Sequence, residues 1–476
     1  MLSLGSLNPN LLDAEYAVRG PIVLRAQQLE EQGKKIVYCN IGNPQALKQP
    51  PLSFLRQLLS LIEYPELLRN SEMTRSYPAD IVERVRYILD CHPPGTGAYT
   101  QSAGIPFIRQ AVAEFIVRRD DIPATRERII LTDGASKGAQ AVLLALLRSK
   151  CDGIMIPVPQ YPLYSASIRL YGGEMIGYYL DEENGWQLSE EALTESITSA
   201  RSRGVNPVAI VVINPGNPTG AVLSPENIRM IIGFARKHGL AIIGDEVYQE
   251  NIYSTNVRFH SFAKTMHEMG VIDVSLFSLH SVSKGLLGEC GHRGGYLEIR
   301  NVPEDVLAQF IKLQSISLCA NVPGQLATYM MVAPPRQGDE SYETYVRERD
   351  LVLKSLQGKA EILGKGINSI EGMSLVPPQG AMYAFVRIEL PPDPSVDPDR
   401  MSAHERLEYD TKRDSEYCMA LLEETGICVV PGSGFGQQPG TLHFRTTFLP
   451  PQDEIEGLVA SLKTFHERYI RERQEA

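Results

Sequence analysis

The central part of the chain alternates short apolar segments with stretches of helical character, and this alternation restricts the possible folds most. The apolar segments are Arg128–Leu131, Gly153–Ile156, Val208–Ile213, Leu240–Ile243, Val274–Leu279 and Gly295–Ile299. Such segments, without in-and-out alternation, are typical of strands that are buried on both faces of a sheet. Strands that alternate with helices predict an α/β fold with a mainly parallel sheet flanked by helices.

Chain length and a change of sequence character predict two domains. At 476 residues the chain is longer than one hydrophobic core usually serves. We expect an N-terminal arm with part of a small domain at 1–78, a large domain at 79–345, and a smaller α+β domain at 346–476. Arg347–Ile367 predicts a long amphipathic helix in the smaller domain, and Val18–Gln32 predicts a helix in the arm.

The composition excludes several classes of protein. A formal net charge of -11 argues against a general nucleic-acid binder, because no broad basic surface is implied. Seven cysteines without a CxxC pair argue against a disulfide framework and a zinc site, so we expect reduced, mostly buried thiols and no metal. No apolar stretch approaches the roughly 20 residues of a membrane span. Met1–Asn10 has no basic segment followed by an apolar run, and we therefore expect a cytoplasmic protein.

Polar side chains follow two of the predicted strands, where open α/β sheets place their ligands. Asn217 lies in Asn214–Gly220, an irregular loop with two Asn-Pro steps, and can present its amide to a ligand. Asp245 follows Leu240–Ile243 closely, and a buried carboxylate there must find a partner or stay neutral. A plain turn and a helix cap are the ordinary explanations; an amide contact and a salt bridge to a protonated ring nitrogen are the functional ones. Tyr248 is near enough in sequence to reach the same ligand.

Lys284 lies in Ser281–Gly285, the loop after the strand Val274–Leu279. A lysine in a neutral, partly apolar, Gly-rich loop can have a lowered pKa and act as an amine nucleophile, although most lysines are solvated surface groups. Arg293 enters the next strand beside several glycines, and arginine with hydroxyls and backbone N–H groups binds phosphate. Ser136, at a predicted helix start, offers another anion site.

No single feature is decisive, but their order and joint occurrence are informative. An anion-binding helix start, an amide loop, a buried acid, a lysine in a Ser-rich loop and an arginine together describe one ligand. That ligand has a phosphate, a phenolic oxygen, a basic ring nitrogen and an aldehyde. Pyridoxal phosphate (PLP) has this combination.

At these residues the sequence resembles the fold-type I PLP-dependent aminotransferases, and within them the alanine aminotransferase family. The resemblance covers nearly the whole chain. Outside the motifs above it is carried by Glu15–Ala26, Tyr77-Pro78, Gly97–Thr100, Pro159–Ser165 and Met331–Asp350. It implies an aspartate aminotransferase-like fold, with a large PLP-binding domain and a smaller α+β domain.

The resemblance implies a role for each residue near the cofactor ring. Lys284 holds the cofactor as a Schiff base and forms the catalytic set with Asp245 and Tyr248. Asp245 pairs with the ring nitrogen, while Asn217 and Tyr248 hydrogen-bond the ring oxygen. Tyr161 stacks on the face of the ring.

The remaining implied contacts concern the phosphate and the substrate. The phosphate is held by Ala135, Ser136, Ser281 and Arg293, and Ala135 contacts it through its backbone. Tyr99 reaches the phosphate of a neighbouring subunit, so a homodimer shares its active sites. Arg445, in Leu442–Pro450, matches the arginine that binds the substrate α-carboxylate. Gly42 matches the N-terminal loop that closes over the substrate. Asn217 also contacts the substrate.

We therefore expect transamination between L-alanine and 2-oxoglutarate by a ping-pong mechanism, with small amino acids and 2-oxo acids as partners. Glyoxylate is an alternative acceptor, since no second arginine motif can be assigned to a distal carboxylate. A PLP-dependent lyase or synthase on the same fold stays open. We do not expect a transcription regulator, because the resemblance begins by Glu15 and leaves no room for a DNA-binding module. No GxGxxG or Walker-type loop follows a strand, which disfavours a nucleotide-binding enzyme.

Five other features have ordinary explanations. His280 is expected to pack or hydrogen-bond and not to catalyse, and Trp186 is expected in a surface loop. The charges from His466 to Glu475 indicate a solvated helix end. Lys137 either faces the phosphate or is a surface charge. Tyr383 is expected on a small-domain strand near the cleft, with a direct ligand contact the weaker alternative.

Overall fold

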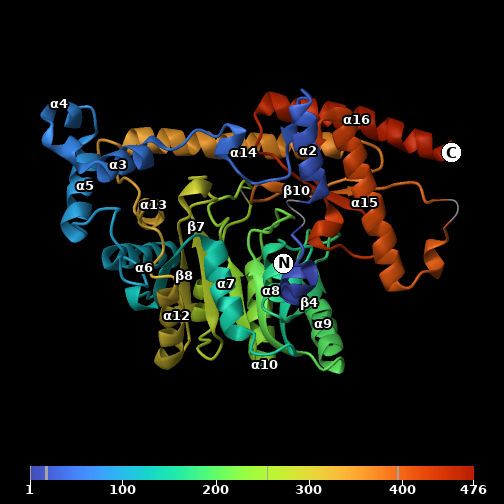
Figure 1. The fold of residues 1–476 in the computed structure, drawn as a ribbon, viewed down its shortest axis with the longest axis horizontal. Coiled ribbons are helices and arrows are strands. Elements are labelled where there is room, and N and C mark those ends of the chain that lie inside the picture. Colours follow the sequence, from blue (N-terminus) through green and yellow to red (C-terminus); the bar gives the residue numbers. More distant parts are fainter. Residues whose placement is uncertain (1, 17–19, 255, 394–395, 476) are drawn as a thin grey trace.

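The computed structural model describes residues 2–16, 20–254, 256–393 and 396–475. Within them, the large domain is built on a seven-stranded sheet with the strand order β2-β8-β7-β6-β5-β3-β4 (Figure 1). The strands are β2 (Ile129–Thr132), β3 (Asp152–Val158), β4 (Glu174–Tyr179), β5 (Asn206–Ile213), β6 (Ala241–Asp245), β7 (Leu276–Ser281) and β8 (Gly295–Arg300). All six predicted segments are strands, and the mainly parallel α/β fold is confirmed.

Two details of the sheet differ from the expectation. β4 was not predicted because it lies at the edge of the sheet, where burial alternates and the apolar run is broken. β8 runs antiparallel to β2 and β7, whereas β3 to β7 pair in parallel. Arg293 lies just before β8, as expected from the sequence. Because β8 is antiparallel, its start lies at the same edge of the sheet as the ends of β5, β6 and β7.

Helices cover both faces of this sheet (Figure 1). One apolar cluster packs under α7 (Ala135–Leu146), α8 (Leu163–Leu170) and α12 (Glu304–Ile316). The other packs under α6 (Pro106–Asp120), α9 (Glu190–Ser202), α10 (Pro225–His238), α11 (Phe262–Glu268) and α13 (Val322–Val332). α10 illustrates how the sequence sets these helices: the Ser224 hydroxyl caps its start and Gly239, in a left-handed conformation, ends it.

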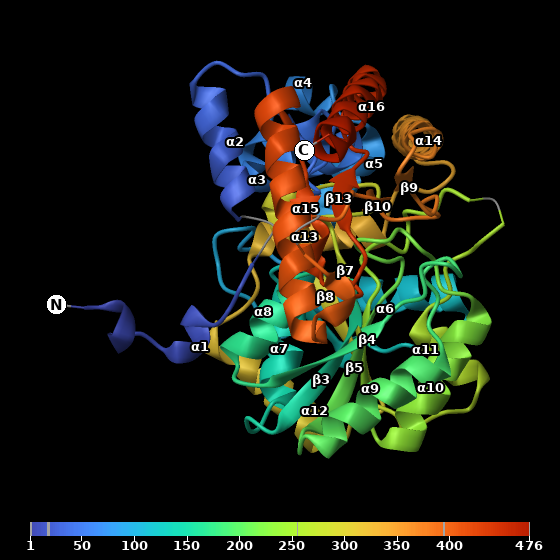
Figure 2. The ribbon, with the colours of Figure 1, turned by 90° about the vertical axis from the view of Figure 1, so that its right-hand side faces the viewer.

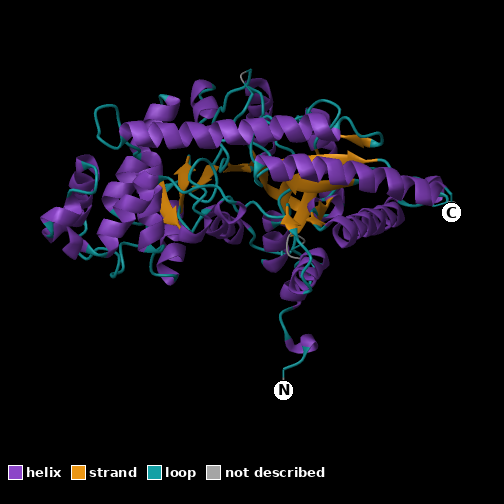
Figure 3. Ribbon diagram, turned by 90° about the horizontal axis from the view of Figure 1, so that it is seen from above, coloured by secondary structure: helices purple, strands orange, loops and turns teal. Residues whose placement is uncertain are grey.

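The small domain has a four-stranded sheet with the order β12-β13-β10-β9. Its elements are β9 (Met373–Ser374), β10 (Tyr383–Ile388), β12 (Val430–Pro431), β13 (His443–Thr447), α14 (Tyr342–Ile367), α15 (Ala403–Thr425) and α16 (Gln452–Gln474). α14 and α16 lie side by side across it (Figure 3). The predicted long helix is confirmed, although α14 begins ahead of Arg347.

The N-terminal segment joins the small domain. α2 (Pro21–Glu31) contacts α15, and β1 (Val37–Tyr38) pairs in parallel with β11 (Ile427–Cys428). The helix expected from Val18 begins only at Pro21 in the described residues, and positions 17–19 lie outside them. α1 (Pro9–Leu12) lies against α8, and the residues before it extend away from the rest of the chain (Figure 2). The exact domain boundaries stay a prediction.

The stretch 331–350, one of those that carry the resemblance, joins α13 to α14. The same stretch is hydrogen-bonded to the starts of α3 (Ser53–Glu63) and α5 (Ala79–Cys91). α4 (Ser71–Thr74) precedes α5. Ser341 donates from its backbone and hydroxyl to Asp80, and Ser53 donates in the same way to Glu348. Short 3-10 helices complete the fold at Leu4–Ser6, Gln45–Leu47, Pro65–Arg69, Arg126–Arg128, Cys290–His292, Pro398–Arg400 and Gly432–Phe435.

Several expectations about single residues are corrected. Trp186 is buried, not in a surface loop, and His466 is buried with its ring 3.0 Å from the Tyr417 hydroxyl. The sequence missed both because their cover comes from distant segments. Lys137 is exposed and is a surface charge, whereas His280 is buried against Phe115 as expected.

The expectation of mostly buried thiols is wrong, since only Cys39, Cys418 and Cys428 of the seven free cysteines are buried. No group of three or more His, Cys, Asp or Glu side chains in the described part of the chain is arranged to hold a metal ion. None of the helices in that part is long and apolar enough to cross a membrane.

Candidate active site

A cavity of about 300 Å³ lies where the large domain meets the small domain and the N-terminal segment. The residues selected from the sequence that line it are Gly42, Ala135, Ser136, Tyr161, Asn217, Asp245, Tyr248, Ser281, Lys284, Arg293 and Arg445. Tyr99 does not line it and is 77% exposed. The contact expected of Tyr99 involves a second subunit, so it stays a prediction, as do the roles of the other residues.

Lys284 lies in the turn after β7, and its Nζ donates a hydrogen bond to the backbone carbonyl of Gly42 at 2.6 Å. A Cβ atom on Gly42 would lie 1.9 Å from the Tyr383 hydroxyl oxygen and 3.1 Å from Lys284 Nζ. A side chain at this position would require Tyr383 to move. The glycine therefore allows the N-terminal segment to approach both groups closely.

Asp245 is the last residue of β6 and is 5% exposed. Its Oδ2 accepts a hydrogen bond from the Tyr164 hydroxyl at 2.7 Å, whereas Oδ1 has no partner among the described residues. Burial raises the pKa of Asp245 to about 6, against the opposing effects of Tyr164, the Val247 backbone and the Lys284 charge. Because a buried polar atom without a partner is costly, Oδ1 is suited to a hydrogen-bond donor on a ligand.

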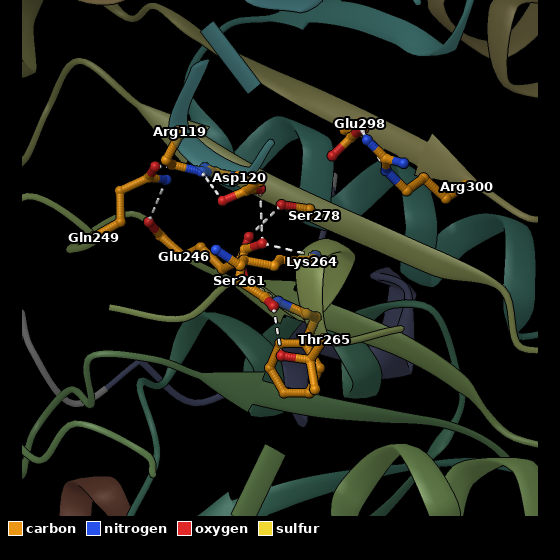
Figure 4. A network of polar contacts seen from close by, with 11 residues as sticks. Arg119, Asp120, Glu246, Gln249, Ser261, Lys264, Thr265, Ser278, Glu298 and Arg300 are labelled. Atoms are coloured by element: carbon orange, nitrogen blue, oxygen red, sulfur yellow. Dashed lines mark hydrogen bonds and ion pairs between the residues drawn. The ribbon is translucent and has the colours of Figure 1, made fainter. Parts of the chain in front are cut away.

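The neighbouring Glu246 anchors the end of β6 in a buried polar network (Figure 4). Its carboxylate accepts hydrogen bonds from the Ser278 hydroxyl at 2.5 Å and from the backbone N–H of Phe262 at 2.9 Å. Burial raises the pKa of Glu246 to about 7, opposed by the charge of Arg119. Since Ser278 belongs to β7, the network joins the two strands whose ends carry the acid and the lysine of the cavity.

Arg445 projects from β13 of the small domain and is 1% exposed. Its guanidinium donates to Asn217 Oδ1 at 3.2 Å and to the Asn40 carbonyl, and its Cζ lies 4.2 and 4.5 Å from the ring centroids of Tyr383 and Phe435. Nε has no hydrogen-bond partner, and no carboxylate within the described ranges forms an ion pair with this cation. A buried cation without a counterion is unfavourable, so the site favours an incoming carboxylate.

Arg293 and the start of α7 form an anion site. The guanidinium of Arg293 donates to the hydroxyls of Ser136 at 3.2 Å and Ser283 at 3.1 Å. The backbone N–H of Ser283 donates in turn to Ser281 Oγ. A Cβ on Gly134, the residue before α7, would lie 2.6 Å from the guanidinium, so glycine is needed for this approach. A helix start, hydroxyls and a guanidinium together suit a phosphate.

Tyr248 and Tyr383 meet edge to face above the lysine, with ring centroids 6.1 Å apart. Burial raises the pKa of Tyr248 well above its ordinary value, and Asn217 donates to its hydroxyl at 3.5 Å. Burial acts in the same direction on Tyr383, but the charges of Lys284 and Arg445 prevail and lower its pKa. Tyr383, the weaker candidate from the sequence, therefore lies at the centre of the site.

The sequence did not point to four other residues of this site. The hydroxyls of Tyr16 and Tyr161 lie 2.8 Å apart, and Tyr164 holds the buried acid. Ser283 and Cys290 line the cavity, with the Cys290 thiol 3.1 Å from the Ser283 carbonyl. Of these four, only Ser283 could have been selected from the sequence, because it lies between Ser281 and Lys284 in the same loop. Tyr16, Tyr164 and Cys290 are brought to the site by the tertiary structure.

Comparison with known proteins assigns the family. Residues 77–462 match the sequence model of aminotransferase class I and II. The chain belongs to this family. It is 46% identical to a protein of Dictyostelium discoideum named probable mitochondrial alanine aminotransferase, over 98% of this chain and 89% of the relative. It is equally similar, at 46%, to mitochondrial alanine aminotransferase 2 of Arabidopsis thaliana, over 99% of this chain and 88% of the relative.

Two further similarities refine the assignment. Glutamate–glyoxylate aminotransferase 2 of Arabidopsis thaliana is 45% identical over 98% of this chain and 96% of its own length. The solved structure of an alanine aminotransferase from Pyrococcus furiosus superposes with a TM-score of 0.77 at 26% identity, covering 97% of this chain and 100% of that one. The chain thus belongs to the alanine aminotransferase family, whose enzymes act on amino acids and 2-oxo acids, and the fold predicted from the sequence is confirmed.

The cytoplasmic location expected from the sequence is contradicted by this comparison. Both alanine aminotransferase relatives named above carry the word mitochondrial in their names. The expectation rested on the character of Met1–Asn10 alone. Cellular address is read by receptors from segments that have no part in the fold, so a folded aminotransferase core carries no signal for it.

Proposed function

We propose that this aminotransferase uses PLP to transfer the amino group of L-alanine to 2-oxoglutarate, giving pyruvate and L-glutamate. One observation carries the proposal: a single cavity joins the Lys284 amine, Oδ1 of buried Asp245 and the guanidinium of buried Arg445. Within the described ranges, that Oδ1 has no hydrogen-bond partner and that guanidinium has no carboxylate partner. The names of the alanine aminotransferase relatives support L-alanine as the donor.

The side chains of the cavity fit PLP. The unpaired Oδ1 of Asp245 suits a protonated ring nitrogen, and the anion site around Arg293 suits the phosphate. Asn217 and Tyr248 offer an amide and a hydroxyl to the ring oxygen, and Lys284 offers its amine to the aldehyde. When bound, PLP supplies an aldehyde that takes up the substrate amino group and a ring that withdraws electrons from its Cα.

The residues of the chain then divide the remaining work. Arg445 binds the substrate α-carboxylate through two parallel N–H donors, which fixes the orientation of the Cα–H bond. With PLP bound, Lys284 Nζ, as a free amine, would accept the proton from the substrate Cα and return it to the carbon of the cofactor's aldehyde group. Asp245, ionised, keeps the hydrogen on the ring nitrogen. Gly42 and Tyr383 lie beside the lysine amine, where they would limit the access of water to it.

The choice of oxo acid is less tightly specified than the amino donor. The cations that line the cavity within the described ranges are Lys284, Arg293 and Arg445, and each has a proposed role. A second carboxylate, as in 2-oxoglutarate, therefore has no dedicated cation in a single subunit. Glyoxylate is the alternative acceptor, and the glutamate–glyoxylate relative supports it.

We further propose a homodimer with shared active sites and domain boundaries near 78 and 345. Tyr99 supports the dimer because a tyrosine side chain that is 77% exposed beside the large domain is available to a second subunit. Sedimentation and activity measured over one dilution series test this. Full activity in the monomer would contradict a shared site.

The proposed activity is tested with PLP-loaded protein, L-alanine and either 2-oxoglutarate or glyoxylate, measuring pyruvate. Pyruvate should form with at least one acceptor, and Lys284→Ala should abolish turnover. Lys137→Ala is the matched control, because this lysine is exposed on α7 and does not line the cavity. Absence of pyruvate with both acceptors, or substantial turnover in Lys284→Ala, would refute the proposal.

A further inference from the structure

The turn at 181–187, between β4 and α9, carries the only tryptophan of the chain. Its ends are joined by hydrogen bonds from the Asp181 N–H to the Gln187 carbonyl at 3.0 Å and from the Trp186 N–H to the Asp181 carbonyl at 2.6 Å. Trp186 has a φ of 63°, a left-handed conformation that is unfavourable for a residue with a Cβ. Such a conformation persists where the surrounding contacts hold it, so those contacts are informative.

The Trp186 ring packs against the small domain. It is 4% exposed and meets Phe385 and His443 edge to face, with ring centroids 5.8 and 6.1 Å away. Val430 and Phe435 belong to the same apolar cluster. The indole N–H has no hydrogen-bond partner in the part of the chain that the structure describes, so packing alone holds the ring. The turn 181–187 of the large domain therefore packs against the small-domain sheet that carries Arg445.

Ionic contacts hold the same turn to the same sheet. One carboxylate oxygen of Glu182 lies 3.2 Å from His443 Nε2 and 3.4 Å from Arg387 Nη1. The adjacent Glu183 also reaches Arg387, at 3.1 Å, but its side chain is 83% exposed, against 16% for Glu182. Shielded ion pairs are screened less than exposed ones, so Glu182 makes the stronger contact.

The other side of the His443 ring is held within the small domain. Its Nδ1 lies 3.2 Å from Gln437 Oε1, and Gln437 directs its Nε2 to the Asp414 carboxylate at 2.9 Å. The Gln437 oxygen is thus the atom that faces the imidazole. Both ring nitrogens of His443 therefore face acceptor oxygens, one on the small domain and one on the turn.

These contacts lead directly to Arg445. His443 and Arg445 are two residues apart on β13, so their side chains lie on one face of the strand. Phe385, which stacks on His443 with centroids 4.5 Å apart, pairs with Arg445 in the strand register. Phe435, in the cluster with Trp186, lies under the Arg445 guanidinium. Phe435 therefore contacts the guanidinium and belongs to the apolar cluster on which the turn rests.

We propose that the turn 181–187 is an interdomain clasp in which Glu182 and Trp186 position Arg445 for the substrate α-carboxylate. The inference rests on the proposed function for the identity of that ligand. Glu182 and Trp186 do not line the cavity that holds Lys284, so they act as positioning residues through His443 and the aromatic rings. A loosened clasp weakens carboxylate binding and leaves the proton transfer at the lysine nearly unchanged, which predicts a change in KM and not in kcat.

The kinetic test compares Glu182→Ala with Glu183→Ala, two neighbouring substitutions that remove the same charge from the same turn. We expect the first to raise the KM for L-alanine about five-fold with kcat within about two-fold, as for loss of one shielded ion pair. The second should leave both parameters at the wild-type values. A wild-type KM in Glu182→Ala, or an equal fall of kcat and kcat/KM, would overturn the clasp.

The spectroscopic test needs no activity, because Trp186 is the only tryptophan and reports on its own contacts. In the folded, cofactor-free protein, Glu182→Ala should shift its emission to longer wavelength and increase quenching by acrylamide, whereas Glu183→Ala should not. Unchanged emission in Glu182→Ala would also overturn the proposal. If circular dichroism shows that Glu182→Ala does not fold, His443→Gln removes the pair from the small-domain side, and the same readouts decide. An inactive wild-type protein with the expected emission shifts would refute the proposed function and leave the clasp standing.

Discussion

Replacing Asp245 with asparagine should affect the protein in opposite directions with and without cofactor. In the cofactor-free protein the carboxylate is buried with one oxygen unpaired, and burial raises its pKa from 3.8 to about 6. At 1.36 kcal/mol per pH unit, this difference corresponds to about 3 kcal/mol. Because the folded protein holds the proton more tightly than the unfolded chain, this stabilisation is complete below pH 3.8 and is lost as pH rises through about 6.

Asp245→Asn should therefore raise the free energy of unfolding of the cofactor-free protein at pH 8, by up to about 3 kcal/mol, and change it little at pH 4. The same substitution should weaken PLP binding and abolish turnover, because asparagine cannot keep a proton on the ring nitrogen. Urea unfolding at both pH values and cofactor titration measure the two effects.

Asp152 on β3 supplies a control of opposite sign. Its hydrogen bonds with Arg148 lower its pKa to about 2, despite burial, so Asp152→Asn should destabilise the protein at pH 8. The reasoning about Asp245 would be refuted if Asp245→Asn destabilised the cofactor-free protein at pH 8, or if it left PLP affinity unchanged.

Substitutions at three further positions, Gly42, Tyr383 and Glu246, test the account. Gly42→Ala should lower kcat/KM at least about 100-fold, because the added Cβ would overlap the Tyr383 hydroxyl. Gly5→Ala is the control and should have no effect, because the space around Gly5 is open. Near-normal activity of Gly42→Ala would contradict the close approach of this segment to Tyr383. Tyr383→Phe should lower kcat about ten-fold and alter the alkaline limb of its pH profile, since neighbouring charges lower the pKa of this hydroxyl; an unchanged profile would exclude its participation. Glu246→Leu should destabilise the protein by about 2–4 kcal/mol in thermal melts, because Ser278 loses its buried acceptor. Glu246→Gln keeps an acceptor without the charge and should gain stability over wild type as pH rises through about 7, the raised pKa of this group; a gain independent of pH would contradict that assignment.

The sheet of the large domain could be predicted because buried parallel strands are apolar over their whole length, as in Val208–Ile213. A search for wholly apolar segments misses Glu174–Tyr179, because this edge strand has one face that is more exposed than the other. It also cannot give strand direction, so the sequence did not show that Arg293 precedes an antiparallel strand. A short sequence segment can indicate that a strand forms, but the position and direction of that strand in the sheet depend on distant parts of the chain.

The candidate site divides in the same way. Asp245 and Lys284 each have an ordinary explanation when taken singly, and they were predictable because they occur together with other polar residues at the ends of predicted strands. Tyr383 was expected near the cleft, but no local pattern showed that it lines the cavity, and Tyr16 reaches the cavity from the N-terminal segment without any such pattern. Trp186 was placed on the surface because its neighbours in sequence are polar; its cover comes from the small domain. Burial between domains is set by tertiary structure, which one sequence window does not contain.

The central claim, that the cavity around Lys284 performs transamination, is tested most directly in a single turnover. PLP-loaded protein is mixed with L-alanine in the absence of any oxo acid, and pyruvate, ammonia and the cofactor absorbance are followed together. We predict one equivalent of pyruvate per bound cofactor, no ammonia, and complete conversion of the cofactor to its amine form, which 2-oxoglutarate or glyoxylate then reverses. Continuous release of pyruvate with ammonia, or loss of the absorbance band without pyruvate, would contradict the account.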